Sequence, residues 1–508
     1  MRHPNPIRLF LLPVVTFTTG ILALFSATSH ATHADKQMLD LAGHRVPVWH
    51  AGVEGGIPDY PDVIDVTALG AVANDGKDDT NAFEAALTQV AGRGAVRIPP
   101  GRFRLSRTLT LPDHTVLRGS GPDTELHIQH TRDAFRVMGQ STGTQPVGQQ
   151  HGWTAVKSGA SRGSMTVTLS DASHLAVGDG VELLQGFDAA LHLTQHRWDV
   201  NWAKRLIGHF SRIIAIEGQQ ITLADPVRID MKPEYGIWLA PVQYRQFSGF
   251  EDFRVIRSSA NQGHVFHIRY ASNIWLTNID SREAHRSHVM AAQGRRLEVR
   301  NSRFHYASDY GKGGHGYGID LSSRQTGSLI VQNRFAHLRH ALVLHLGANG
   351  NVVAYNTSTH TRQSNGGHWQ PDDLSLHGHY AYSNLIEGNR LEGVSISDHW
   401  GPTGPDNVLF RNRIRRDPIA AYDHAQRQII IGNHLPAPGF RLDNSVQSQH
   451  WLVFDNSYQL NGSALPNPDH SRWPDSLFFT QPPTAPQPLY PILSEPKPAS
   501  DKRDTLTL

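Results

Sequence analysis

Residues 408–433 read VLFRNRIRRDPIAAYDHAQRQIIIGN, and this stretch contains one full period of the repeat that decides the fold. One short apolar run leads to Asn412, further short runs follow, and the next such run leads to Asn433. Asn suits this place because its side chain tolerates a left-handed turn and bonds nearby backbone, and stacked Asn side chains also bond one another. A coil of this size holds three short strands and three turns, and it buries its apolar face only against other coils.

The same pattern recurs on both sides of this stretch. The recurring positions are Asp252, Asn278, Asn301, Asn333, Asn356, Asn389, Asn412, Asn433 and Asn456, with spacings of 26, 23, 32, 23, 33, 23, 21 and 23 residues. Such a series predicts a parallel β-helix whose main coils span residues 246–460. The alternative is a β-sandwich in which the spacing is accidental.

Other segments fit around these coils. Residues 62–145 predict an N-terminal cap and the first coils, with a helix-like run at 81–90 that would cover the open strand edges. Residues 146–245 break the rhythm and alternate as strands, which predicts a β-rich insertion. Residues 32–61 form an N-terminal extension, and residues 461–508 a Pro-rich C-terminal tail.

The N-terminus and the composition limit the function. Residues 1–31 have basic residues, then an apolar run, then small residues, which predicts a signal peptide and a periplasmic or secreted protein; an uncleaved anchor is the alternative. The 508 residues include no Cys, which excludes disulfides and thiolate chemistry. With 47 Lys and Arg against 45 Asp and Glu, no nucleic-acid partner is expected. After signal cleavage no membrane association is expected either.

The segment from Asp65 through Thr80 to Gly101, with Gly119-Ser120-Gly121, resembles the N-terminal part of the pectate-lyase-like right-handed parallel β-helix superfamily. This superfamily includes polysaccharide lyases, polygalacturonase-type hydrolases, epimerases and phage tailspikes. The resemblance implies an all-β, right-handed parallel β-helix (solenoid) with an N-terminal capping helix. It leaves the reaction open because one fold hosts several chemistries.

Two long intervals, 301–333 and 356–389, predict neighbouring loops that form a groove on one side of the coils. Several strands nearby end in His or Asp at similar offsets from the recurring Asn, so we expect one polar stripe that includes Asp423, and that His267 and His288 would continue in the preceding coils. The candidate catalytic residues are Asp320, His345, His377, Asp398 and His399, with Tyr317 and Asp373. The candidate substrate-binding residues are Arg339, His340, Arg362, Trp369, His379, Trp400, Arg411 and Arg413.

Imidazoles beside carboxylates can exchange protons with a sugar chain near neutral pH. In a lyase that acts by β-elimination, His345 or His377 would be the base, Tyr317 or His399 the acid, and Arg339 or Arg362 would neutralise a uronate. In a glycoside hydrolase, two of Asp320, Asp373 and Asp398 would flank the scissile bond.

Local motifs do not decide between these reactions. Asp372-Asp373 and Gly378-His379 resemble polygalacturonase motifs with a different spacing and order, and the run from Ile396 to His399 resembles a pectate-lyase motif without its companion residues. We favour the lyase because His and Arg outnumber unpaired acids near the stripe. A non-catalytic glycan-binding or adhesin-type β-helix is the third hypothesis. No cofactor is required and no metal site is predicted, although a bound Ca²⁺ is left open, as is the oligomeric state.

Overall fold

The computed structural model describes residues 38–41, 43–92, 94–141, 153–192, 200–257, 263–311, 313–364, 370–397, 400–460, 463–464 and 473–483. The predicted signal peptide, 1–31, lies outside these ranges. Within them no helix is both long and apolar enough to cross a bilayer.

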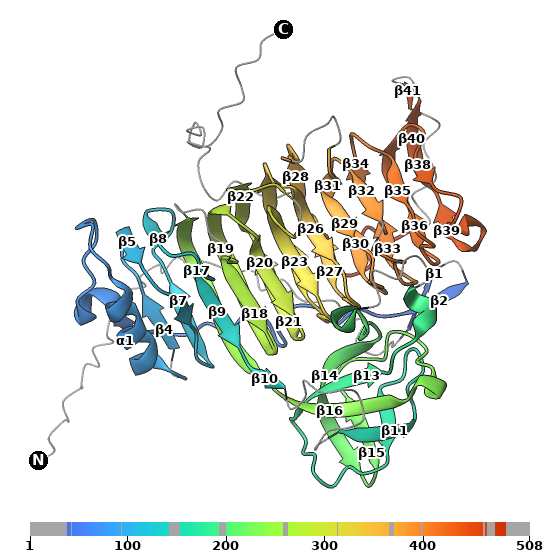
Figure 1. The fold of residues 1–508 in the computed structure, drawn as a ribbon, viewed down its shortest axis with the longest axis horizontal. Helices are drawn as coiled ribbons and strands as arrows, with labels where there is room; N and C mark the ends of the chain where they lie inside the picture. Colours follow the sequence, from blue (N-terminus) through green and yellow to red (C-terminus); the bar gives the residue numbers. More distant parts are fainter. Residues whose placement is uncertain are drawn as a thin grey trace, which may run out of the picture.

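The described chain winds into stacked coils, and each coil adds one strand to each of three parallel ladders (Figure 1). We call them the first ladder, the second ladder and the third sheet. The first ladder contains β3 (Asp62–Asp65), β4 (Gly94–Arg97), β7 (Thr115–Arg118), the first halves of β17 (Arg245–Arg257) and β19 (Ala271–Ala284), β21 (Arg295–Arg300), β24 (Leu329–Val331), β27 (Val352–Ala354), β30 (Leu385–Glu387), β33 (Val408–Phe410), β36 (Ile429–Ile431) and β39 (Leu452–Phe454).

The second ladder follows a bend in each coil. It contains β5 (Gly101–Leu105), β8 (Thr124–Ile128), the second halves of β17 and β19, β22 (Arg303–Ala307), β25 (Arg334–Ala336), β28 (Thr357–Thr359), β31 (Arg390–Leu391), β34 (Arg413–Ile414), β37 (His434–Pro436) and β40 (Ser457–Leu460), on which β41 (Ser463–Ala464) pairs antiparallel.

The third sheet closes each coil. It contains β6 (Leu109–Thr110), β9 (Phe135–Met138), β18 (Phe266–Arg269), β20 (Ser287–Ala292), β23 (Tyr317–Ser322), β26 (His340–Leu344), β29 (Leu374–Leu376), β32 (Val394–Ile396), β35 (Ile419–Ala421) and β38 (Phe440–Leu442). Inward-facing side chains of all three ladders form one continuous apolar core along the coils.

A buried Asn ladder holds the bend between the first and second ladders. From Asn333 to Asn456, each Asn donates from Nδ2 to Oδ1 of the next, at 2.9 to 3.1 Å. The first three predicted members are wrong by one residue. Asp252, Asn278 and Asn301 lie at the preceding left-handed position, with φ of 59°, 54° and 51°. In the coil before Asn333 the ladder position belongs to Ser302, whose N–H donates to Asn333 Oδ1 (3.0 Å).

A second Asn ladder, which the spacing of the first does not predict, precedes the first-ladder strands. Asn351 donates from Nδ2 to Asn384 Oδ1 (2.9 Å), and Asn384 donates to Asn407 Oδ1 (2.9 Å). All three are fully buried. Because buried amides must find partners, the two ladders favour a single alignment of neighbouring coils.

The outer face of the first ladder is covered by segments from both ends of the described chain. The hairpin of β1 (Met38–Leu41) and β2 (His44–Pro47), with Trp49, packs on outward-facing Leu329, Val352 and Leu385 and their neighbours. Leu477 and Phe478 pack on the same apolar surface. Strands buried on both faces are mostly apolar, as these are apart from the buried Glu387 at the end of β30.

Helix α1 (Thr80–Val90) covers the N-terminal end of the coils, as predicted, and lies at the left of Figure 1. It buries Phe83, Ala86 and Leu87 against the first coils. The short 3₁₀ helices among the described residues are η1 (Val66–Leu69), η2 (Ala189–His192), η4 (Asn201–Ala203), η5 (Pro233–Tyr235) and η6 (Ser448–His450).

The insertion is a seven-stranded antiparallel sheet below the coils in Figure 1. Its strands are β10 (Gln140–Ser141), β11 (Thr154–Ser158), β12 (Thr166–Leu169), β13 (Gly180–Gln185), β14 (Gly208–Glu217), β15 (Gln220–Leu223) and β16 (Ile237–Gln243). Buried contacts fix it to the coils: Tyr382 Oη donates to Gly208 O (2.8 Å), and Arg324 Nε donates to Glu182 Oε1 (3.0 Å).

Candidate functional site

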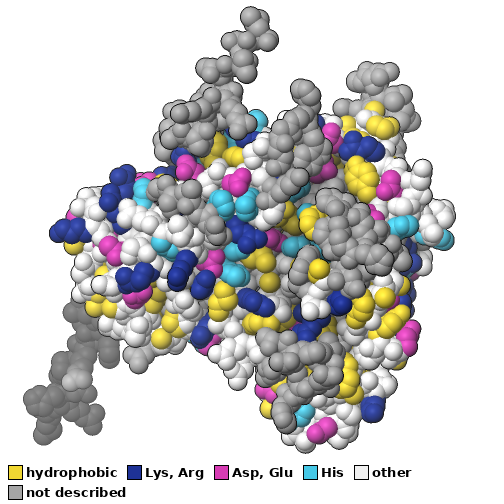
Figure 2. Space-filling view, in the orientation of Figure 1, with side chains coloured by type: hydrophobic (Ala, Val, Ile, Leu, Met, Phe, Trp, Pro, Cys, Tyr) yellow, Lys and Arg dark blue, Asp and Glu magenta, His cyan; other side chains and the backbone are white. Residues whose placement is uncertain are grey.

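The outer face of the third sheet carries a row of polar side chains. Ile319 of β23 and Leu342 of β26 are in register and buried in the core, so Asp320, the next residue after Ile319, faces outward. His side chains gather in the middle of the face seen in Figure 2, with basic and acidic side chains among them. The row, which we call the polar line, consists of Asp133, His267, His264, Ser287, Asp320, His345, His377 and Trp400.

The centre of the polar line is an Asp–His pair. Asp320 Oδ1 accepts a hydrogen bond from His345 Nε2 (2.8 Å), and Asp320 Oδ2 accepts from Ser287 Oγ (3.5 Å). The Asp320 side chain is 9% exposed and that of His345 is 20% exposed, so the imidazole lies above the carboxylate. A carboxylate on Nε2 fixes the tautomer and leaves Nδ1 of His345 to accept a proton.

His377 lies beside this pair because its strand is in register with that of His345. Leu344 and Leu376 are partners across β26 and β29, and each precedes one of these histidines. The two rings are 5.9 Å apart between centroids, and the Trp400 ring is 5.9 Å from His377 on the other side. Trp400 is half-buried, so it offers part of an aromatic face beside two imidazoles.

Tyr317 and His340 form the floor of the site. They are partners across β23 and β26, their rings pack edge to face at 5.2 Å, and they are only 5% and 6% exposed. His340 Nδ1 donates to Asp372 O (2.7 Å), and its ring is 6.2 Å from that of His377. Both are therefore placed to support His377 rather than to reach a polymer.

The polar line continues towards the N-terminal coils. His267 Nδ1 bonds Asp133 Oδ2 (3.1 Å), the His264 and His267 rings are 5.1 Å apart, and Ser287 N donates to His264 Nδ1 (3.4 Å). From β9 to β32 the line crosses six coil-to-coil steps, or about 29 Å at about 4.8 Å per step. His267 is predicted from the sequence to lie here, whereas Asp133, His264 and Ser287 are not.

The sequence does contain a signal that predicts His264 and Ser287 on this face. His264 and Ser287 each come two residues before an inward apolar residue, as Tyr317 and His340 do. The expectation for His288 was wrong: it is fully buried and bonds Ser281 Oγ (2.7 Å).

Burial and neighbouring charges set the protonation of this site. Burial by itself raises the pKa of Asp320, but the charge and hydrogen bond of His345, with charge from His264 and His377, hold that pKa below its ordinary value. Burial, with the charges of His377 and Arg339, lowers the pKa of His340 to about 3. Near neutral pH, Asp320 is therefore an anion and His340 is uncharged.

The structure contradicts Asp373 as a catalytic residue. Its carboxylate is fully buried and accepts hydrogen bonds from Ser358 Oγ (2.8 Å) and from Glu392 N. The adjacent Asp372 is half-buried at the N-terminal edge of the third sheet. Burial and the charge of Asp417 raise the pKa of Asp372 to about 6. Asp372, not Asp373, is therefore the carboxyl of this pair that could exchange a proton with a ligand.

The two long loops meet, as predicted. Ser364 N donates to Tyr310 O (3.4 Å). Arg339 binds one loop through Gly311 O (2.6 Å), while its charge lowers the pKa of His340, so Arg339 lies beside the site. Arg362 lies instead at the turn beside His337, to which its Nε donates (3.2 Å).

Arg411 and Arg413 lie on a different face from the one predicted. Arg413 belongs to β34 of the second ladder, and Arg411 donates to Trp473 O (3.0 Å) beside the C-terminal segment. A cavity of about 460 Å³ lies at this corner, lined by Arg390, Arg411 and Arg413 among others. None of the residues named as lining this cavity belongs to the polar line. In this coil the third-sheet strand, β35, begins only at Ile419, several residues after Arg413.

Further predicted residues fall in three positions. Asp398, His399 and Trp369 lie outside the described residues. His379 is 4% exposed and its ring is 6.0 Å from that of Trp400, so it is buried beside Trp400. Asp423 accepts a hydrogen bond from the backbone N of Gly401 (2.9 Å), the residue after Trp400.

Family models match two parts of the chain. Residues 63–170 match a model described as rhamnogalacturonase A/epimerase, pectate lyase-like, and residues 212–370 match one described as right handed beta helix region. Residues 63–170 are thus similar to a pectate-lyase-like family and residues 212–370 to right-handed β-helix proteins, which agrees with the predicted resemblance. The predicted parallel β-helix fold is confirmed. No curated protein sequence matches the chain.

Solved structures agree on the fold. The Pseudomonas phage phi297 tailspike gp61 aligns with a TM-score of 0.51 and 12% identity, covering 78% of this chain and 73% of the tailspike. The tailspike protein gp49 from Pseudomonas phage LKA1 aligns with a TM-score of 0.50 and 14% identity, covering 79% and 74%. At these identities the likeness to the two tailspikes extends to the fold alone.

Proposed function

We propose that this protein is an exported polysaccharide-degrading enzyme that cleaves acidic glycans by β-elimination, with His345 as the base. The observation that carries the proposal is the Asp320–His345 pair, in which a carboxylate with a lowered pKa holds a partly exposed imidazole at 2.8 Å. The pair lies in the middle of a polar line that runs across successive coils, so an extended polymer can lie over it. Export is inferred from the signal peptide predicted at residues 1–31.

The roles follow from the geometry. Asp320 holds the Nε2–H of His345, so Nδ1 takes the proton next to a uronate carboxyl group. His377 is proposed to protonate the leaving oxygen, because its ring lies next to that of His345 (5.9 Å). Arg339 is proposed to neutralise the uronate carboxylate, because its charge already acts on His340 in the floor of the site. Trp400 provides an aromatic face for a neighbouring sugar.

One observation favours a second candidate, a glycoside hydrolase. Hydrolysis needs a carboxyl group that stays protonated and a second carboxylate that does not. Asp372, with a pKa raised to about 6, and Asp320, with a lowered pKa, are such a pair. A glycan-binding protein without catalysis is the third candidate. In each case the partner is a polysaccharide, and no role is assigned to nucleic acid or to a membrane.

The test is to incubate the protein without residues 1–31 with a panel of acidic and neutral polysaccharides. Ultraviolet absorbance of an unsaturated uronate at the new chain end means elimination, whereas new reducing ends without that absorbance mean hydrolysis. Binding without either product supports the third candidate. The His345→Ala variant is the matched control, since the proposal requires that it bind polymer and form no product.

A further inference from the structure

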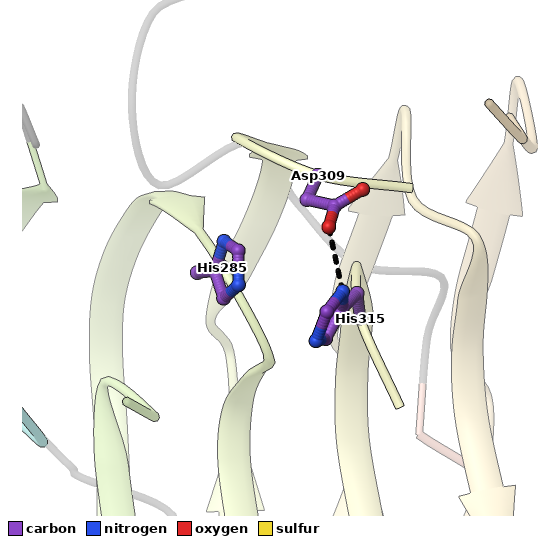
Figure 3. Close-up of side chains that lie close together, drawn as sticks. All are labelled: His285, Asp309 and His315. Carbon is purple, nitrogen blue, oxygen red and sulfur yellow. Dashed lines mark hydrogen bonds and ion pairs between the residues drawn. The ribbon is translucent and has the colours of Figure 1, made fainter. Parts of the chain in front are cut away.

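A second cluster of chemically active side chains lies beside the polar line. His285 is in the turn between β19 and β20, and Asp309 and His315 are in the loop between β22 and β23. Figure 3 shows the three side chains facing one another across these two neighbouring coils. The mechanism proposed above uses none of them.

The three side chains are close enough to share one ligand. One ligand atom from each lies within 4.8 Å of those of the other two, and all three residues are half-buried. His315 Nδ1 and Asp309 Oδ2 are 2.6 Å apart, and the rings of His285 and His315 are 4.5 Å apart at an angle of 45°. Imidazole and carboxylate ligands lie at about 2.0–2.2 Å from a Zn²⁺ ion, so small side-chain rotations bring all three to one ion.

Backbone hydrogen bonds tie the loop to the turn that carries His285. Ser308 N donates to Ala284 O (3.0 Å), and Gly316 N donates to His285 O (3.0 Å). These bonds hold the two ends of the loop against the turn that carries His285. The three side chains are therefore kept close together by the backbone. The ligand set is thereby assembled before any ion binds.

Further hydrogen bonds orient the individual side chains. Asp309 Oδ1 accepts from Gly311 N (2.8 Å), which leaves Oδ2 directed at His315. His285 Nδ1 lies 3.3 Å from Ser308 Oγ, which leaves Nε2 of the same ring available to a ligand. Partners of this kind fix ring orientation at metal sites. The middle of the loop is also anchored, because Arg339 donates to Gly311 O (2.6 Å).

We propose that His285, Asp309 and His315 bind one divalent transition-metal ion, of which Zn²⁺ is the representative. Two imidazoles and one carboxylate suit zinc and its first-row neighbours, whereas Ca²⁺ takes oxygen ligands almost exclusively. Three protein ligands leave at least one position of the ion open. His315 lies two residues before Tyr317, so the ion is bound at the N-terminal edge of the third sheet, beside the polar line.

The test measures binding of Zn²⁺ to the purified chain without residues 1–31, prepared without a polyhistidine tag and treated with a chelator. We expect one equivalent per chain by isothermal titration and by elemental analysis after desalting. His285→Ala and Asp309→Asn should lose this equivalent. His450→Ala, which removes an exposed histidine of η6, should keep it. Because no polysaccharide is present, the result does not depend on the proposed lyase activity.

A milder variant covers the case in which a ligand substitution disturbs folding. Ser308→Ala leaves all three ligands in place and removes the partner of His285 Nδ1, so the affinity for Zn²⁺ should fall by about 10-fold or more. Co²⁺ in place of Zn²⁺ should give a visible absorption band in the unaltered chain and in His450→Ala, and none in His285→Ala. Absence of a stoichiometric equivalent in the unaltered chain, or equal binding by His285→Ala, would overturn the proposal and leave the cluster as a hydrogen-bonded clamp on the loop.

Discussion

Asn389→Ala is the sharpest test of what holds the coils in alignment. The Asn389 side chain is fully buried and takes part in four hydrogen bonds. It donates from Nδ2 to Asn412 Oδ1 (2.9 Å) and Val353 O (2.8 Å), and its Oδ1 accepts from the backbone N and the Nδ2 of Asn356 (2.9 and 3.0 Å). Alanine removes all four and fills none of the positions.

The expected loss follows from these bonds. A buried hydrogen bond contributes about 1 kcal/mol net, and a buried polar group left without its partner costs about 1–3 kcal/mol. Loss of four bonds should therefore lower the free energy of unfolding by about 4 kcal/mol. The buried N–H of Asn356 is one of the groups that would lose its partner. The substitution removes no apolar side chain, so this destabilisation is assigned to the polar ladder alone.

Urea unfolding, followed by circular dichroism and by tryptophan fluorescence, measures the change. Asn444→Ala is the matched control because Asn444 is exposed, and a surface substitution of this kind changes the free energy of unfolding by about 0.5 kcal/mol or less. The reasoning is refuted if Asn389→Ala and Asn444→Ala unfold at the same urea concentration. That result would mean that apolar packing, and not the Asn ladder, keeps the coils aligned.

The remaining predictions concern the site and its surroundings. His345→Ala should lower the turnover of the cleaved glycan by about 10²–10⁴-fold with the thermal midpoint almost unchanged, and a large loss of stability would instead show a structural role. Asp320→Asn should shift the pH–rate profile of cleavage as well as lowering kcat, which a purely structural role would not do. Arg413→Ala should leave cleavage unchanged, because Arg413 lies on the second ladder; a loss of activity would contradict the placement of the substrate. Burial raises the pKa of both Asp373 and Glu387 to about 7, so their burial favours the protonated forms, and the free energy of unfolding should fall as the pH rises from about 4 to above 7. Asp373→Asn should flatten that fall in urea titrations at several pH values, and an unchanged slope would show that Asp373 does not titrate in this range.

Much of the fold was predictable because each coil of a solenoid repeats the same pattern of strands and turns. A period of about one coil places equivalent residues side by side, so the alignment of His345 and His377 followed from the sequence alone. The ladder register was less secure. The spacing between Asn278 and Asn301 is the same whether they lie at the left-handed bend or at the ladder position, so spacing could not distinguish the two. Ser302, which takes the ladder position, gives no repeat signal.

The site was harder to predict than the coils for a physical reason. A coil has three outer faces, and the chain reaches the next face after only a few residues. Arg413 follows Asn412 directly, yet the bend at Arg411 (φ 51°) turns it onto the second ladder. Likewise Asp372 and Asp373 are adjacent and both precede β29, but Asp373 is fully buried whereas Asp372 is only half-buried. Residue type and spacing give the coil, and the position of each bend decides the face.

The outer face of the first ladder is covered by two segments that are far apart in the sequence, the β1–β2 hairpin and the segment around Leu477. Glu387 bonds Ser476 Oγ (2.6 Å) and Leu477 N (2.9 Å), so the late segment is pinned by a buried acid as well as by apolar contact. Removal of either segment would expose the apolar outer face of the first ladder to solvent. Shortened versions would then be prone to self-association through this apolar face. Any loss of the proposed activity on truncation would then reflect aggregation rather than a change in the polar line.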